Sequence, residues 1–173
     1  MRICLRYLVP HAVLLSLLLS SCTSCSQSGG SQTADPLLPP YPQFDRQTAF
    51  AFLETQCEFG PRVPGTQPHQ KCLDWLIQEL ARFGGTVIPQ RFSASTPFGG
   101  PFDFTNVIAY FPGNAPGGPV LLGAHWDTRP EADEDPDPAL RKQPVLGAND
   151  GASGVAVLLE IARQAHDRPE RRS

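Results

Sequence analysis

The chain has 173 residues, of which 40% are hydrophobic, and it carries 14 basic and 17 acidic side chains for a formal net charge of −3. This length allows one domain at most. The acidic balance and the lack of any basic run in the sequence argue against nucleic acid as a partner.

The first 21 residues have the pattern of a secretory signal. Arg2 and Arg6 precede an apolar run at 12–19, which is shorter than the roughly 20 residues that span a bilayer. The letters LSSC at 19–22 then resemble the bacterial lipobox, whose cysteine becomes the lipidated first residue of the mature protein. We therefore expect a bacterial lipoprotein, exported to the periplasmic or cell-surface side and anchored to the membrane through Cys22. The alternative is an ordinary signal peptide with an incidental cysteine.

Residues 22–43 are rich in Ser, Gly, Gln and Pro and predict a flexible tether. The folded part is then expected over residues 44–173. Within it, Cys57 and Cys72 could form a disulfide in an oxidising exported setting, where the bond would stabilise the fold by about 3 kcal/mol. The alternative is two free thiols. No CxxC pattern or nearby His accompanies them, so they do not predict a zinc site.

Helices are predicted over 47–57, 67–83 and 151–165, because each has apolar residues at helical spacing and the first two follow good N-cap residues. His69 and Glu160 fall on these helices and are predicted to face solvent.

Strands are predicted at 86–92, 104–111 and 120–124, and the last is continuously apolar, as in a strand covered on both faces. The segment 93–103 is predicted to be a loop long enough to line a pocket rim. Helices alternating with strands indicate an α/β fold, here a partial three-layer sandwich with a mixed, mostly parallel central sheet. Because the sequence closes on an amphipathic helix, we expect the C-terminal part of the domain to be missing.

Potential metal ligands follow the apolar strand at 120–124. His125 and Asp127 lie on the same side if the extended conformation continues, and Asp150 precedes the last helix, at the sheet edge where open α/β folds build their sites. Imidazole and carboxylate are ligands of zinc, and one of the first pair can bind the metal while the other orients it. Asp150 could bind one metal or bridge two, although an aspartate before a helix is often only a cap.

Five segments of the sequence match one family pattern. They are FGPRVPGT (59–66), FTNVIA (104–109), GAHWDTR (123–129), GANDGASGV (147–155) and LLEIAR (158–163). Together they resemble the zinc aminopeptidase and glutaminyl-peptide cyclotransferase superfamily, and within it the bacterial glutaminyl cyclase-like branch. The resemblance covers roughly residues 44–165 and implies the N-terminal part of a zinc-aminopeptidase-like domain.

The resemblance implies roles for three residues. Asp150 matches the central metal-binding aspartate, which bridges two zinc ions in the aminopeptidases and binds the single zinc of the cyclases. His125 matches a histidine that binds the second zinc in aminopeptidases and need not bind metal in cyclases, and Asp127 matches the carboxylate that supports it. The family also needs a Glu-Glu pair, a later aspartate and a final metal-binding histidine, and we expect these to lie beyond the sequence matched here.

The implied activity of the complete domain is the zinc-dependent conversion of an N-terminal glutamine of a peptide or protein to pyroglutamate, with release of ammonia. Two alternatives stay open: a two-zinc aminopeptidase that hydrolyses N-terminal residues, and a catalytically dead lipoprotein. For the 173 residues alone we expect no measurable cyclase activity and weak zinc binding. The sequence indicates no oligomeric state.

Overall fold

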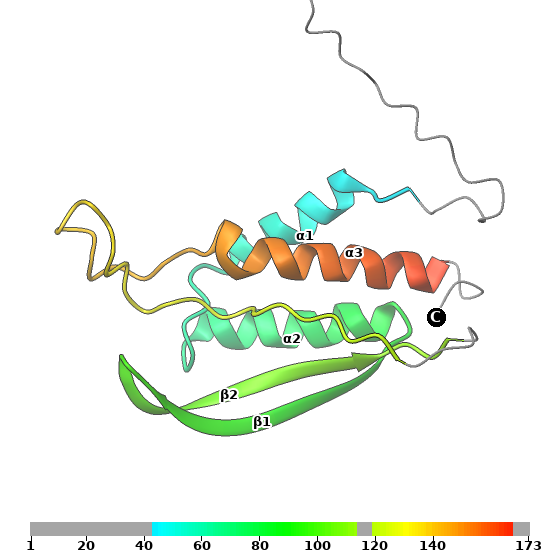
Figure 1. Cartoon of the computed structure of the whole chain (residues 1–173), viewed down its shortest axis with the longest axis horizontal. Helices are drawn as coiled ribbons and strands as arrows, with labels where there is room; N and C mark the ends of the chain where they lie inside the picture. The colour runs from blue at the N-terminus through cyan, green and yellow to red at the C-terminus, as the bar shows by residue number, and fades with distance from the viewer. Residues whose placement is uncertain (1–42, 114–118, 168–173) are drawn as a thin grey trace, which may run out of the picture. The chain divides into compact units, whose positions relative to one another are not determined.

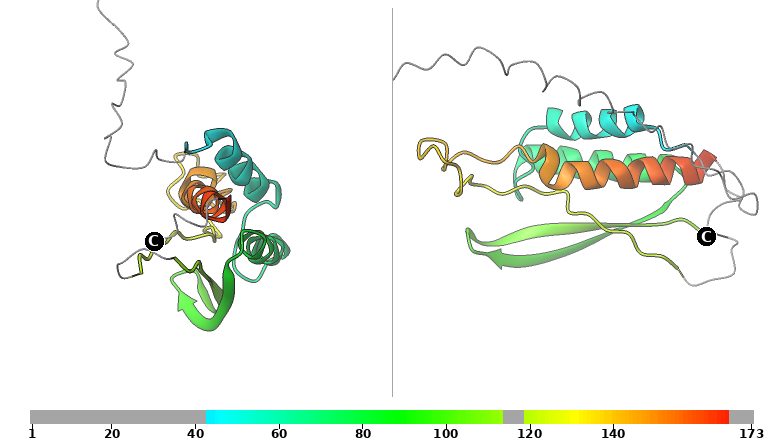
Figure 2. Two further views of the ribbon diagram at one scale, coloured as in Figure 1. Left: turned by 90° about the vertical axis from the view of Figure 1, so that its right-hand side faces the viewer. Right: turned by 45° about the horizontal axis from the view of Figure 1, so that its top comes forward.

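A computed structural model of the chain describes residues 43–113 and 119–167. Its elements are α1 (Arg46–Glu58), α2 (Gln67–Arg82), β1 (Thr86–Thr96), β2 (Gly99–Tyr110), the irregular turn η1 (Ala148–Ala152) and α3 (Ser153–Asp167). Figures 1 and 2 show α1 and α3 side by side, with the β1–β2 hairpin against α2. The predicted signal peptide, Cys22 and the tether up to residue 42 lie outside the described residues. Within these ranges, no helix combines the length and the apolar character that crossing a bilayer requires.

All three predicted helices are confirmed, with small shifts at their ends. The carboxylate of Asp45 accepts hydrogen bonds from the backbone N–H groups of Gln47 at 2.9 Å and Thr48 at 3.1 Å. The hydroxyl of Thr66 likewise accepts from the N–H of His69 at 3.4 Å. These side chains satisfy N–H groups that have no partner inside the first helical turn, which is why α1 and α2 begin where they do.

The prediction of a loop at 93–103 is wrong, because this segment completes a β-hairpin. The two strands pair antiparallel with Thr96 opposite Gly99, so only Pro97 and Phe98 form the turn. Proline and glycine suggested a loop in the sequence. In the structure Pro97 lies in the turn, and Gly99, Gly100 and Pro101 lie beside an irregularity in the strand register. A two-stranded ribbon tolerates proline and glycine at such positions.

The segment 120–124 was predicted to be a buried strand, and the structure contradicts this. It has no strand partner among the described residues, and Val120, Leu121 and Leu122 are exposed, Leu121 by 91%. The α/β class is confirmed, but the sheet formed by the described residues is a two-stranded antiparallel ribbon rather than the expected mixed, mostly parallel sheet. A strand needs a hydrogen-bonded neighbour, and an apolar run alone does not supply one.

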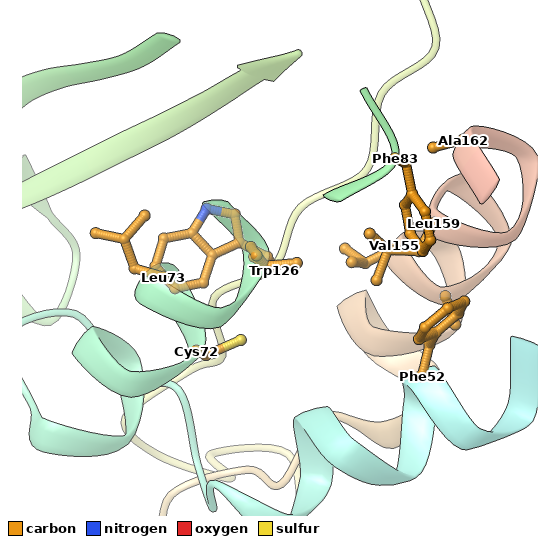
Figure 3. Close-up of a cluster of buried hydrophobic side chains, with 10 residues drawn as sticks. Phe52, Cys72, Leu73, Phe83, Trp126, Val155, Leu159 and Ala162 are labelled. Carbon is orange, nitrogen blue, oxygen red and sulfur yellow. The ribbon is translucent and has the colours of Figure 1, made fainter. Parts of the chain in front are cut away.

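The core joins the three helices to the extended chain that follows residue 119. Its buried members are Phe52, Cys72, Leu73, Leu76, Phe83, Trp126, Val155, Ala156, Leu159 and Ala162. Figure 3 shows Phe52 and Phe83 against α3, and Trp126 beside Leu73 of α2. The indole N–H of Trp126 donates to the carbonyl of Thr105 in β2 at 3.1 Å. Burial of a large apolar side chain contributes about 1.5–3 kcal/mol, so Trp126 fixes the extended chain between α2 and the hairpin.

Two polar residues that were predicted to face solvent are buried instead. His69 is 6% exposed, and its ring stacks on Trp126 with the centroids 4.2 Å apart. Glu160 is fully buried, where its carboxylate pairs with Arg163 at 2.7 Å and accepts from the backbone N–H of Asp45 at 3.1 Å. Helical spacing locates the apolar stripe but not the polar residues that a neighbouring element covers, and this explains both errors.

The two cysteines of the described residues are free thiols, so the disulfide considered between Cys57 and Cys72 is not formed. Cys72 is fully buried in the core and Cys57 is half-buried. Burial raises the pKa of the Cys72 thiol to about 12. The thiol of Cys72 is therefore a small apolar group of the core.

Candidate metal centre

The structure brings the three predicted site residues together. His125 and Asp150 meet with the imidazole Nε2 2.9 Å from the carboxylate Oδ1. The other ring nitrogen of His125, Nδ1, lies 3.1 Å from the backbone oxygen of Asp127 and 3.7 Å from its Oδ1. The prediction was that the carboxylate of Asp127 orients the ring. In the structure the backbone oxygen of Asp127 is the nearer contact. If Nδ1 carries the proton for that bond, Nε2 presents a lone pair towards Asp150 and is the ring's ligand atom.

A non-helical turn places Asp150 against the histidine. Within η1, Asp150 has φ −86° and ψ 98°, and Gly151 has φ 98° and ψ −61°. A Cβ atom added at Gly151 would lie 3.0 Å from Cε1 of His125 and 3.1 Å from its backbone oxygen. Glycine is thus required here both for its positive φ and for the close approach of the imidazole. This turn is also the reason that α3 begins at Ser153, two residues later than predicted.

Arg62 connects the two chain segments that carry the site. Its side chain is fully buried and donates from Nε to the carbonyl of Trp126 at 3.2 Å, from Nη1 to Leu146 at 2.7 Å and from Nη2 to Gly147 at 2.8 Å. Two further carbonyls, at the end of α1 and in the turn after it, lie 3.4 Å from Nη1. Trp126 directly follows the site histidine, and Gly147 leads into the turn with the site aspartate, so one guanidinium holds both segments. Arg62 was not predicted as a site residue, and its only sequence signal was its place in the FGPRVPGT segment.

The donor atoms suit zinc in kind, but two ligands do not complete a site. Zinc in proteins takes three or four ligands at about 2.0–2.2 Å, so two ligands of one ion lie roughly 3–3.5 Å apart. The Nε2–Oδ1 distance of 2.9 Å between His125 and Asp150 is close to that separation. Among the residues that the structure describes, no group of three His, Cys, Asp or Glu side chains could hold a metal ion. The pair is open to solvent, with side chains 55% and 62% exposed.

Two cavities flank the extended chain around His125. One, of about 270 Å³, is lined by His125 and Asp150 together with the hairpin turn and the turn between α1 and α2. The other, of about 250 Å³, is lined by His125, His69 and residues of β2. Burial lowers the pKa of His69, with the charge of Asp127 opposing that shift, so the His69 ring is neutral near pH 7.

Comparison with known proteins identifies the fold. The sequence profile of peptidase family M28 matches residues 106–173. A glutaminyl cyclase from Tannerella forsythia is 43% identical over 73% of this chain, with a TM-score of 0.68. A Zn-dependent exopeptidase from Parabacteroides distasonis is 44% identical over 75% of the chain, with a TM-score of 0.70. The described residues carry the N-terminal part of a peptidase M28-type fold. A glutaminyl cyclase from Porphyromonas gingivalis is similar too, at 45% identity over 71% of the chain and a TM-score of 0.66.

The chain spans less than half the length of these three structures, namely 43%, 44% and 42% of them. A comparison with curated protein sequences gave no match. The structural neighbours are glutaminyl cyclases and zinc-dependent exopeptidases, which confirms the resemblance carried by segments 123–129 and 147–155. They also support a zinc-dependent enzyme in general terms.

Proposed function

We propose that this chain supplies part of the metal centre of a zinc-dependent glutaminyl-peptide cyclotransferase. Its reaction converts an N-terminal glutamine of a peptide or protein to pyroglutamate with release of ammonia. The observation that carries the proposal is the pair His125–Asp150, with Nε2 and Oδ1 2.9 Å apart, in a chain 43% and 45% identical to two glutaminyl cyclases.

In this proposal, the Asp150 carboxylate would hold the metal and His125 Nε2, 2.9 Å away, would be a second ligand, a role that the resemblance gives it in the aminopeptidases and leaves open in the cyclases. A zinc ion bound there supplies Lewis acidity for the side-chain amide carbonyl of the substrate. The backbone oxygen of Asp127 accepts from Nδ1 and keeps the imidazole in the tautomer that binds through Nε2. Gly151 leaves the space that the imidazole occupies. The bond that forms joins the substrate's α-amine nitrogen to its side-chain carbonyl carbon, and the bond that breaks releases the side-chain nitrogen as ammonia.

A second candidate is a two-zinc aminopeptidase, which the 44% identity to a Zn-dependent exopeptidase favours. In that case Asp150 would bridge two metal ions and His125 would bind the second. A catalytically dead lipoprotein is the third candidate, favoured by the finding that the described residues contain no group of three His, Cys, Asp or Glu side chains that could hold a metal ion. We further propose export and membrane attachment through a lipid on Cys22.

The test uses the native protein that carries this sequence, loaded with zinc and incubated with a glutaminyl peptide and with an unblocked amino-acid amide. The proposal expects pyroglutamate and ammonia from the first substrate, one zinc per chain, and loss of both products in Asp150→Ala. Two zinc ions per chain with hydrolysis of the amide and no cyclisation would establish the aminopeptidase instead. If a correctly folded protein neither cyclises the glutaminyl peptide nor hydrolyses the amide, the catalytically dead lipoprotein is the remaining candidate.

A further inference from the structure

The larger cavity beside the metal centre has an aromatic wall that the proposed reaction does not use. The wall residues are Pro97, Phe98, Phe102 and Phe104 of the hairpin and Val63 and Pro64 of the turn between α1 and α2. Figures 1 and 2 show why they meet: the hairpin turn, the α1–α2 connection and the chain after residue 129 lie at the same end of the described fold. The cavity therefore joins three segments that are distant in sequence, and His125 and Asp150 are part of its lining.

The chemistry of this wall favours an apolar occupant. Proline, valine and phenylalanine side chains offer no hydrogen bond, so an amide buried against them would lose its bonds to water without replacement. The polar lining residues are those of the site itself, with Thr96, Thr128 and Arg129. Arg129 is already paired with Asp133 at 2.8 Å. The reacting glutamine side chain therefore belongs at the metal centre, and an apolar group belongs against the aromatic wall.

We propose that this cavity receives the apolar or aromatic side chain of the second residue of the peptide substrate. The inference rests on the proposed function, because that function places the first residue at His125 and Asp150. Consecutive Cα atoms are 3.8 Å apart, so the second side chain lies within reach of a cavity that starts at the same pair. Small-molecule sites usually enclose about 300–1,000 Å³, and the cavity here, at about 270 Å³, suits one side chain rather than a longer peptide.

Phe98 is the residue on which the test depends. It lies in the hairpin turn and is 40% exposed, with its backbone N–H donating to the hydroxyl of Thr96 at 3.2 Å. Truncation of an exposed turn side chain removes part of the cavity wall with little effect on the core. Phe50 is the matched control, because it is 58% exposed on α1 and does not line the cavity.

The experiment is an NMR titration of the native protein that carries this sequence, loaded with zinc, with L-glutaminyl-L-phenylalanine amide, L-glutaminylglycine amide and L-alanyl-L-phenylalanine amide. Burial of a phenyl ring predicts that the first peptide binds about tenfold to hundredfold more tightly than the second. Phe98→Ala should reduce this ratio to about threefold or less, whereas Phe98→Leu and Phe50→Ala should keep it. The backbone spectrum of each variant reports whether its fold is intact.

Equal binding of the first two peptides would overturn the inference, as would a preference that survives in correctly folded Phe98→Ala. The same holds if neither peptide binds. Failure of the proposed function has a different result: the alanyl peptide would bind as tightly as the glutaminyl peptide, while the preference for phenylalanine over glycine and its loss in Phe98→Ala would remain. That result keeps the cavity as a site for the second side chain and removes glutamine as the first residue.

Discussion

Replacement of Arg62 by methionine tests how the two segments of the metal centre are held together. Methionine fills a similar volume but donates no hydrogen bond. The variant leaves the carbonyls of Trp126, Leu146 and Gly147 without the donors that now lie 3.2, 2.7 and 2.8 Å away. Its effect therefore measures the hydrogen bonds of the guanidinium rather than its bulk.

The magnitude follows from two opposing contributions. A hydrogen bond from a charged donor contributes about 1.5–3 kcal/mol, and Arg62→Met loses the three bonds of 2.7–3.2 Å together with two weaker ones at 3.4 Å. The buried guanidinium, however, carries a desolvation cost of several kcal/mol, which methionine does not. We expect a net loss of about 2–4 kcal/mol in the free energy of unfolding, a large part of the roughly 5–15 kcal/mol that stabilises an ordinary domain.

The assay combines urea unfolding with the NMR signals of His125. Arg91→Met is the control, since Arg91 is an exposed residue of β1 and its replacement should change the free energy of unfolding by no more than about 0.5 kcal/mol. Arg62→Lys retains the charge but not the planar guanidinium, so its loss of unfolding free energy should lie between those of Arg62→Met and Arg91→Met. In folded Arg62→Met the imidazole signals should shift, because the chain on both sides of the site is no longer held.

A stabilising role of the Arg62 hydrogen bonds is contradicted if Arg62→Met unfolds at the same urea concentration as the parent. A positioning role is contradicted if that variant loses stability while the imidazole signals of His125 stay unchanged, because Arg62 would then support the fold without positioning the site.

Three further outcomes follow from particular contacts. Gly151→Ala should cost about 1–3 kcal/mol, measured by urea unfolding, and displace the His125 ring in NMR, because the residue at 151 has a positive φ and the ring lies 3.0 Å from the added Cβ. Burial alone would raise the pKa of Glu160, but hydrogen bonds from Arg163, Gln164 and a backbone N–H lower it below 4.5. The contribution of the Glu160 carboxylate to stability is therefore complete above about pH 4.5 and is lost as the pH falls through its folded-state pKa. Glu160→Gln should flatten the acid limb of a curve of unfolding free energy against pH. With a pKa raised from 9.0 to about 12, Cys72 should resist iodoacetamide at pH 8 until the chain unfolds, as read by mass spectrometry. Its contribution to stability is complete below about pH 9 and is lost as the pH rises towards 12.

Local sequence was sufficient for the features that depend on neighbours along the chain. The caps at Asp45 and Thr66 mark the starts of α1 and α2 because their side chains bond to N–H groups two or three residues ahead. His125, Asp127 and Asp150 could be predicted together because the resemblance covers both segments that carry them. In the structure, Nε2 of His125 lies 2.9 Å from Oδ1 of Asp150, and Nδ1 lies 3.1 Å from the backbone oxygen of Asp127.

Local sequence was insufficient where burial depends on segments that are distant along the chain. Arg62 is charged and would ordinarily face solvent. Its hydrogen bonds are instead accepted by the carbonyls of Trp126, Leu146 and Gly147, which lie 64, 84 and 85 positions further along the chain. His69 is covered by Trp126, and Glu160 by the start of α1. The apolar segment 120–124 shows the converse, because its composition fits a buried strand while the described residues provide no partner for it. In each case the deciding contact lies far away in sequence.

The central claim is that His125 and Asp150 bind zinc together, and an NMR titration of the full chain with Zn²⁺ tests it most directly. We predict a metal-induced shift at Nε2 of His125, with Nδ1 remaining protonated through its contact with the backbone oxygen of Asp127, 3.1 Å away. Asp150→Ala should abolish this shift, whereas the signals of the buried His69 should not respond to zinc. The claim is contradicted if zinc leaves His125 unchanged, or if the shift persists in Asp150→Ala.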